Sequence, residues 1–214
     1  MDPSLPLFQP HVPVLLQPPS ALDHGTKNLQ TPHSVLGGIA GPPWNMIAST
    51  SSMWQDHKHS IAMTYSTPDN GTEGHQFNET TTWCGDTVKN SSTGISRSVP
   101  DEPGRVYDWR GTGWLRLITT RWEIVGLGGL PILVGHDHTK EIAQPSSGSD
   151  CEQVPVLVTF VRKTMFSPQA LSVLVRPQLD DAQKAAIIEH VAGLLKGLGV
   201  TSLSAEVDRL RPIP

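Results

Sequence analysis

The chain has 214 residues, which is enough for one well-formed core, so we expect a single domain. Its formal net charge is −4 and it contains no basic run, which argues against a nucleic-acid-binding surface. Charged residues make up only 17% of the chain, whereas there are 19 glycines and 19 prolines. This composition favours many short strands joined by turns over a helical fold.

Residues 1–33 are rich in proline and show no hydrophobic periodicity, so they predict an extended or disordered arm with few core contacts before a domain over 34–214. The alternative is that the arm serves as a lid or docks a partner. Residues 1–20 contain no Lys or Arg, and prolines interrupt every apolar run. We therefore expect no secretory signal, no membrane span and a cytoplasmic location, with Cys84 and Cys151 as free thiols.

From residue 44 onward, β-forming segments alternate with turn signals such as Pro68-Asp-Asn-Gly71. About eight strands are predicted, over 44–50, 60–66, 76–83, 93–99, 105–109, 114–125, 156–164 and 170–176. Eight strands in series predict a mainly β protein with a single antiparallel barrel, near the size at which a barrel first holds a small ligand. A long loop is expected over 127–153, either as a lid or as a disordered segment.

One helix is predicted, over residues 181–196. Asp180 is a favourable N-cap and Gln183 follows three residues later, as in a capping box. Apolar residues recur at helical spacing from Ile187 to Leu198, and Gly197 follows the last turn. The helix is therefore expected to pack against the outside of the barrel or to close one end.

Three motifs carry a family resemblance: Asp108-Trp-Arg-Gly-Thr-Gly-Trp-Leu115, Trp122-Glu-Ile-Val-Gly126 and Thr159-Phe-Val-Arg-Lys-Thr-Met-Phe-Ser-Pro168. With the strand pattern, they resemble the lipocalin-like (calycin) barrels, and more narrowly a family of uncharacterised fungal proteins found beside natural-product pathways. The resemblance implies an apolar small molecule, such as a polyketide or terpenoid, as substrate or ligand. Lipocalins carry Gly-x-Trp in their first strand, whereas here Trp-x-Gly-x-Gly (residues 109–113) lies mid-chain.

The predicted strand over 114–125 sorts its side chains unevenly between two faces. One face carries Trp114, Arg116, Ile118 and Trp122, whereas the other carries the opposite charges of Arg121 and Glu123. Because pockets combine apolar walls with a few polar groups, we place the first face inward. The alternative is that Arg116 is an ordinary surface residue and the tryptophans fill the core. Further candidate lining residues are Tyr65, Trp54, Trp83 and Phe160.

Two histidine pairs have spacings that suit a metal: His57 with His59, and His136 with His138. Neither pair has a third ligand at motif spacing, so solvent-exposed loop histidines are the preferred interpretation. His190 on the predicted helix is the one candidate for an axial haem ligand, since haem barrels of the nitrobindin type also carry Trp-x-Gly-x-Gly, but near their start. We expect no metal and no cofactor.

These features favour a cofactor-independent cyclase or isomerase, such as one for an intramolecular Diels–Alder reaction in fungal secondary metabolism. Arg116 or Tyr65 would polarise a substrate carbonyl, and the tryptophans would hold the substrate folded. The alternative is a non-catalytic binder or carrier of a hydrophobic molecule, and a third interpretation is a haem or metal barrel. The sequence predicts neither the substrate nor an oligomeric state.

Overall fold

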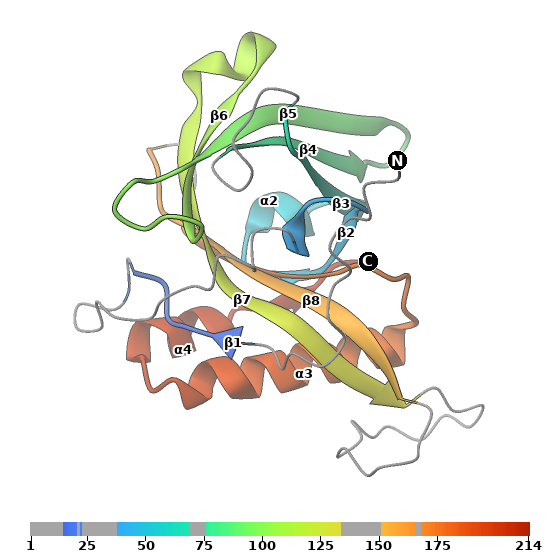
Figure 1. The fold of residues 1–214 in the computed structure, drawn as a ribbon. Helices are drawn as coiled ribbons and strands as arrows, with labels where there is room; N and C mark the ends of the chain where they lie inside the picture. The colour runs from blue at the N-terminus through green and yellow to red at the C-terminus, as the bar shows by residue number, and fades with distance from the viewer. Residues whose placement is uncertain (1–14, 21, 23–37, 69–75, 134–150, 166–167) are drawn as a thin grey trace, which may run out of the picture.

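The structure is a computed structural model that describes residues 15–20, 22, 38–68, 76–133, 151–165 and 168–214. Eight of its strands form a barrel (Figure 1). They are β2 (Trp44–Ser49), β3 (His59–Ser66), β4 (Gln76–Cys84), β5 (Lys89–Ser98), β6 (Val106–Gly111), β7 (Thr119–Leu133), β8 (Cys151–Val161) and β9 (Ala170–Val175).

Each barrel strand pairs antiparallel with the next one in sequence, and β9 pairs back onto β2. The sheet therefore closes as an up-and-down barrel, which removes its exposed edges. This confirms the predicted mainly β fold, a single antiparallel barrel with a C-terminal helix.

The C-terminal helix α3 (Asp181–Gly197) begins at the predicted capping box. The Gln183 backbone N–H donates to Asp180 Oδ1 at 2.8 Å, and the Asp180 N–H donates to Gln183 Oε1 at 3.1 Å. Its buried side chains, Ile187, Val191 and Leu195, pack outside the barrel, as one of the two predicted placements proposed. A second helix, α4 (Thr201–Val207), and the short strand β10 (Arg211–Pro212), which pairs with β2, follow it and were not predicted.

The apolar residues form two clusters, one on each side of the barrel wall. The outer cluster joins α3 and α4 to residues of β2, β7, β8 and β9. Figure 1 shows β7 and β8 above the two helices. The inner cluster lines the interior of the barrel. Alternation along β8 illustrates the division, because Val156 and Val158 belong to the outer cluster and Leu157 to the inner one.

Residues 38–40 cover one end of the barrel. The Arg176 guanidinium lies 4.5 Å from the centre of the Trp44 ring and donates to the carbonyl oxygens of Gly38 and Ala40 at 2.6 and 2.9 Å. The Trp44 indole N–H donates to the carbonyl of Ile39, whose side chain is fully buried. Trp44 therefore occupies the first barrel strand, a position to which the sequence analysis, which noted only the motif over 109–113, gave no role.

Two predicted boundaries around β7 are wrong. Residues 113–117 form a 3-10 helix, η1 (Gly113–Leu117), rather than the start of a strand. Gly113 has φ of +59°, and a Cβ atom on Gly111 would lie 2.5 Å from the Leu115 Cβ, so both glycines permit this tight turn. The expected loop over 127–153 is also too long, because β7 runs to Leu133 and β8 begins at Cys151, with Gly129 opposite Pro155. The remainder, 134–150, lies outside the described residues.

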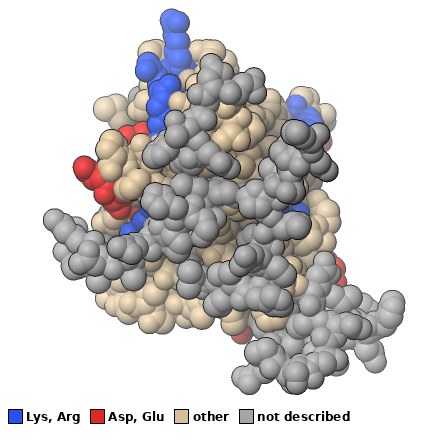
Figure 2. Space-filling view, viewed as in Figure 1, with Lys and Arg blue, Asp and Glu red and all other residues tan. Residues whose placement is uncertain are grey.

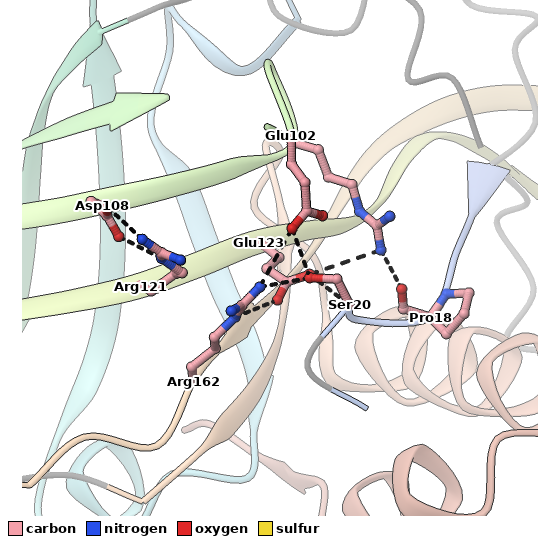
Figure 3. A network of polar contacts seen from close by, with 8 residues as sticks. Pro18, Ser20, Glu102, Asp108, Arg121, Glu123 and Arg162 are labelled. Carbon is pink, nitrogen blue, oxygen red and sulfur yellow. Dashed lines mark hydrogen bonds and ion pairs between the residues drawn. The ribbon is translucent and has the colours of Figure 1, made fainter. Parts of the chain in front are cut away.

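Part of the N-terminal arm contacts the barrel. Its strand β1 (Leu15–Leu16) pairs with β7, and Leu16 and Leu22 pack against the outer cluster. Ser20 donates through its backbone N–H and its hydroxyl to Glu123 Oε2, at 2.7 and 3.0 Å (Figure 3). The expectation that the arm makes few core contacts is therefore wrong for this segment.

The same network shows that Glu123 does not face solvent as predicted. Its side chain is fully buried on the outer side of β7 and is paired with Arg162 at 2.8 Å and Arg105 at 3.8 Å (Figure 3). Arg105 also donates to the carbonyl of Pro18. The arm covers a carboxylate that would otherwise be exposed, which no local pattern around residue 123 indicates.

Candidate functional site in the barrel interior

Aromatic side chains from four strands meet inside the barrel. Trp122 stacks on Tyr107 with ring centres 4.7 Å apart and lies 5.6 Å from Tyr65. Phe77 lies 5.5 Å from Tyr107 and 6.2 Å from Tyr65. The four rings come from β3, β4, β6 and β7, and each is at most 4% exposed. They form one aromatic cluster around the polar groups described next.

A chain of two hydrogen bonds runs through this cluster. The Trp122 indole N–H donates to Ser96 Oγ at 2.9 Å, and the Ser96 hydroxyl donates to Glu79 Oε2 at 2.9 Å. Strand register explains the arrangement, since Phe77 lies opposite Ser96 and Tyr65 lies opposite Glu79. Alternate residues share a face, so Glu79 points inward with Phe77. Within the part of the chain that is described, only Ser96 donates to the Glu79 carboxyl.

Burial raises the pKa of Glu79 to about 7, and the hydrogen bond from Ser96 opposes this rise only in part. The carboxyl therefore exchanges its proton near neutral pH. Burial, the Glu79 charge and Tyr107 also raise the pKa of Tyr65 well above its usual value. Burial likewise raises the pKa of Tyr107. Both phenols therefore remain neutral hydrogen-bond donors at physiological pH.

Two hydroxyl groups in this region are buried without a hydrogen-bond partner among the described residues: Tyr107 Oη and Thr120 Oγ1. Both residues lie on the inward-facing side of their strands. Tyr107 lies opposite the inward-facing Trp122, and Thr120 lies two positions before Trp122 on the same strand. The Tyr65 hydroxyl has a weak acceptor, Met63 Sδ at 3.9 Å. Since buried polar groups are almost always paired, these hydroxyls are candidates to contact a bound molecule or water.

The structure brings together only some of the predicted site residues. Tyr65 and Trp122 lie in the aromatic cluster, as proposed. Trp54 belongs to the short helix α2 (Ser52–Gln55) and contacts Trp83, with ring centres 5.7 Å apart. Both rings pack against the inner cluster from the end of the barrel opposite residues 38–40, and the Lys58 ammonium lies over them. Ile118 is half-buried at the end of η1.

Three site predictions are wrong about position. Trp114 is 86% exposed and Arg116 is also exposed, because both belong to η1 and do not follow the strand alternation assumed for them. Phe160 is fully buried but belongs to the outer cluster, facing the helices, because it shares its face of β8 with Val156 and Val158. A carbonyl-polarising role for Arg116 inside the barrel is therefore not compatible with this fold.

Sequence reasoning missed Glu79, Ser96, Tyr107 and Thr120. A signal for Glu79 was available, since Phe77, Glu79, Thr81 and Trp83 alternate along β4 and place one carboxylate among apolar and aromatic residues. No comparable signal marks Ser96, because its partners lie on β4 and β7, 17 and 26 residues away.

No group of three His, Cys, Asp or Glu side chains suited to a metal occurs among the described residues. His57 is exposed and lies 3.8 Å from Asp86, and His59 contacts Ser60, while His136 and His138 lie outside the described residues. His190 is half-buried on α3, which packs on the outer side of the barrel. Cys84 is a free thiol, and the Cys151 side chain is not described. None of the described helices has the length and apolar character needed to cross a membrane.

Searches against protein-family models and against curated proteins find no match. Among solved structures, the chain is similar to insecticyanin from the tobacco hornworm Manduca sexta, with a TM-score of 0.48 and 9% identity over 84% of this chain and 79% of that one. It is also similar to an odorant-binding protein, with a TM-score of 0.44 and 10% identity over 86% of this chain and 94% of that one.

Proposed function

We propose that this protein binds an apolar small molecule that carries a hydroxyl or carbonyl group, such as a polyketide or terpenoid, inside the barrel. The observation that carries the proposal is a buried carboxyl group, Glu79, in an aromatic interior. Among the residues that the structure describes, it has one donor, which is neutral, and it lies beside hydroxyls that have no partner. Apolar walls with a few convergent polar groups are the usual composition of small-molecule sites. A cytoplasmic location and a role in fungal natural-product metabolism belong to the same proposal.

The polar groups would select the ligand, and the rings would supply most of its affinity. A ligand hydroxyl can donate to Glu79, and a ligand carbonyl can accept from Tyr107 or Thr120. Each such bond contributes about 1 kcal/mol, or more when the acceptor is charged. A hydrocarbon of the same shape leaves these groups unpaired and binds more weakly.

The test is a binding titration that follows Trp fluorescence, with matched pairs of terpenoid alcohols, ketones and hydrocarbons. The alcohol is expected to bind about tenfold more tightly than its hydrocarbon, and Glu79→Ala should remove most of that difference. Glu189→Ala, which removes an exposed carboxylate on α3, is the matched control and should change nothing. If alcohol and hydrocarbon bind equally, or if neither binds, the proposal is wrong.

A second candidate function, an isomerase, is favoured by the pKa of Glu79 at about 7. A group that exchanges its proton near the working pH is suited to general acid–base catalysis. The Glu79 carboxylate would remove a proton from the carbon beside a substrate carbonyl while Tyr107 donates a hydrogen bond to the developing enolate oxygen. The protonated Glu79, after exchange of its proton with solvent, would then protonate the γ carbon, which moves a double bond into conjugation. Cyclisation by positioning alone would use the same aromatic cluster.

Hydrogen exchange separates the isomerase from the binder. An isomerase is expected to incorporate deuterium from heavy water into a bound β,γ-unsaturated ketone, with a rate that rises through the pKa of Glu79 near pH 7. Glu79→Gln should abolish the exchange, while ketone binding persists. If ligand binds but no exchange occurs above the uncatalysed rate, the protein is a binder and the isomerase candidate is rejected.

A further inference from the structure

Four connections meet at the end of the barrel opposite residues 38–40. In an up-and-down barrel successive turns alternate between the two ends, so the β2–β3, β4–β5, β6–β7 and β8–β9 connections share one end. We call this end the rim and define it as residues 50–58, 85–89, 110–118 and 163–165. In Figure 1 its β6–β7 turn is at the top and its β4–β5 turn at the upper right.

The rim holds nearly all of the exposed large apolar side chains among the described residues. Five of the six belong to it, and every one of its four connections contributes at least one. They are Met53 (51% exposed), Val88 (60%), Trp114 (86%), Leu117 (82%) and Met165 (90%). The sixth, Leu194, lies on α3 and is 39% exposed. Apolar exposure concentrated in this way marks an interaction surface rather than ordinary scatter.

The same rim is basic within an acidic chain. It contains the five cations Lys58, Lys89, Arg110, Arg116 and Lys163 and the two acids Asp56 and Asp86, a formal charge of +3 against −4 for the whole chain. Lys and Arg side chains form the blue projection at the top of Figure 2, over the β6–β7 turn. Cations interspersed with exposed apolar side chains complement a partner surface that combines anionic groups with an apolar interior.

We propose that the rim docks on a phospholipid membrane with anionic headgroups. Trp114 and Leu117 lie on one turn of η1, with Arg116 between them in sequence, so a single tip offers two apolar side chains and a cation. Tryptophan favours the headgroup region, and each cation near an anionic surface adds attraction. An extended membrane surface can contact several separate tips at once, whereas a single protein groove would have to fit each of them. This inference is independent of the interior site.

Flotation with lipid vesicles tests the inference. We expect the full chain to bind vesicles that contain about one-quarter phosphatidylserine and to bind pure phosphatidylcholine vesicles at least tenfold more weakly. Trp114→Ser combined with Leu117→Ser should lower the partition coefficient at least tenfold. Leu194→Ser is the matched control and should leave it unchanged. Because all three side chains are exposed, equal melting temperatures are expected and would exclude misfolding.

A separate variant tests how much the cations of the rim contribute to vesicle binding. Arg116→Gln with Lys163→Gln should weaken binding to anionic vesicles about fivefold per charge and leave the weak binding to neutral vesicles unchanged. Arg97→Gln, an exposed cation near the other end of β5, is the control. The proposal is overturned if the wild type does not bind anionic vesicles, or if the Trp114/Leu117 variant binds as well as the wild type. It is also overturned if the rim instead mediates concentration-dependent self-association without binding vesicles.

Discussion

Glu79 and Glu123 are both buried glutamates in the wall of one barrel, but their surroundings differ. Glu123, on the outer side of β7, accepts from the Arg162 guanidinium and twice from Ser20, and lies near Arg105. Glu79, on the inner side of β4, accepts from a single donor in the described part of the chain, the Ser96 hydroxyl. A buried charge is tolerated when cations and hydrogen-bond donors surround it. The partners of Glu123 are therefore sufficient to account for its burial, and no functional role is needed to explain it. The sparse pairing at Glu79 has no such explanation, which makes it the functional candidate.

The largest expected effect comes from Glu123→Ala, which removes the carboxylate paired with Arg105 and leaves Arg162 with the more distant Glu102, at 3.8 Å. Breaking a buried pair from one side costs about 3–5 kcal/mol of stability, which corresponds to a fall in melting temperature of about 6–20 °C. Asp108→Asn is the control, since the Asp108–Arg121 pair is exposed and such pairs contribute about 0–1 kcal/mol. Equal losses in the two variants would contradict the contrast between buried and exposed pairs.

The second effect is the pH dependence that Glu79 gives to stability. Because its folded pKa of about 7 exceeds the usual carboxyl value of 4.5, the folded state binds more protons than the unfolded state between these values. The free energy of unfolding should therefore fall by about 3 kcal/mol as pH rises from 4.5 to 7.

Urea denaturation of the wild type and of Glu79→Gln at several pH values measures this contribution. The variant keeps a neutral polar group and should lose the fall in stability, becoming more stable than the wild type above pH 7. If the difference between the two proteins does not change with pH, the carboxyl of Glu79 is ionised without penalty in the folded state.

Ser20→Ala should have a smaller effect, about 1–2 kcal/mol, because it removes hydroxyl contacts to Glu123, Glu102 and Arg162 but retains the backbone N–H bond to Glu123. Thermal unfolding would show a shift of about 2–8 °C. A shift within error would indicate that the arm contributes only through its backbone and through Leu16 and Leu22.

The smallest effect on stability is expected for Tyr107→Phe. The hydroxyl that it removes has no partner among the described residues, so stability should change by less than about 1 kcal/mol in either direction. Affinity for a carbonyl-bearing ligand should nevertheless fall about fivefold in the fluorescence titration. A large loss of stability with unchanged affinity would assign the hydroxyl a structural role instead.

Local patterns predicted the elements of this fold well. Alternation placed the barrel strands, and the Asp180–Gln183 capping box placed the start of α3, because both signals depend on residues a few positions apart. The extrapolation of one strand back to Trp114 failed, since Gly111 and Gly113 allow a 3-10 turn that interrupts the alternation before Thr119. The predicted Trp114 and Arg116 wall failed with it.

Alternation along a strand was easier to predict than which of its two faces points into the barrel. Phe160 faces the outer side of the wall rather than the predicted inner side, whereas Glu123 faces the predicted outer side but is buried there instead of exposed to solvent. In a barrel covered by helices on one side, both faces of β7, β8 and β9 are buried, so polarity no longer distinguishes inside from outside. On β4 and β6 the pattern still carries that information, because the inward-facing Phe77 and Tyr107 are buried while their neighbours Asn78 and Asp108 are exposed.

The sequence by itself determined the class of fold, the number of barrel strands and the capped C-terminal helix, because alternation, turns and caps are short-range. The tertiary structure alone decided which carboxylates are buried and what pairs with them. Ser96 reaches Glu79 across 17 residues, and Ser20 reaches Glu123 across 103. Partners so far apart meet only when strand register and barrel closure bring them together, and the chemistry of both glutamates depends on those partners.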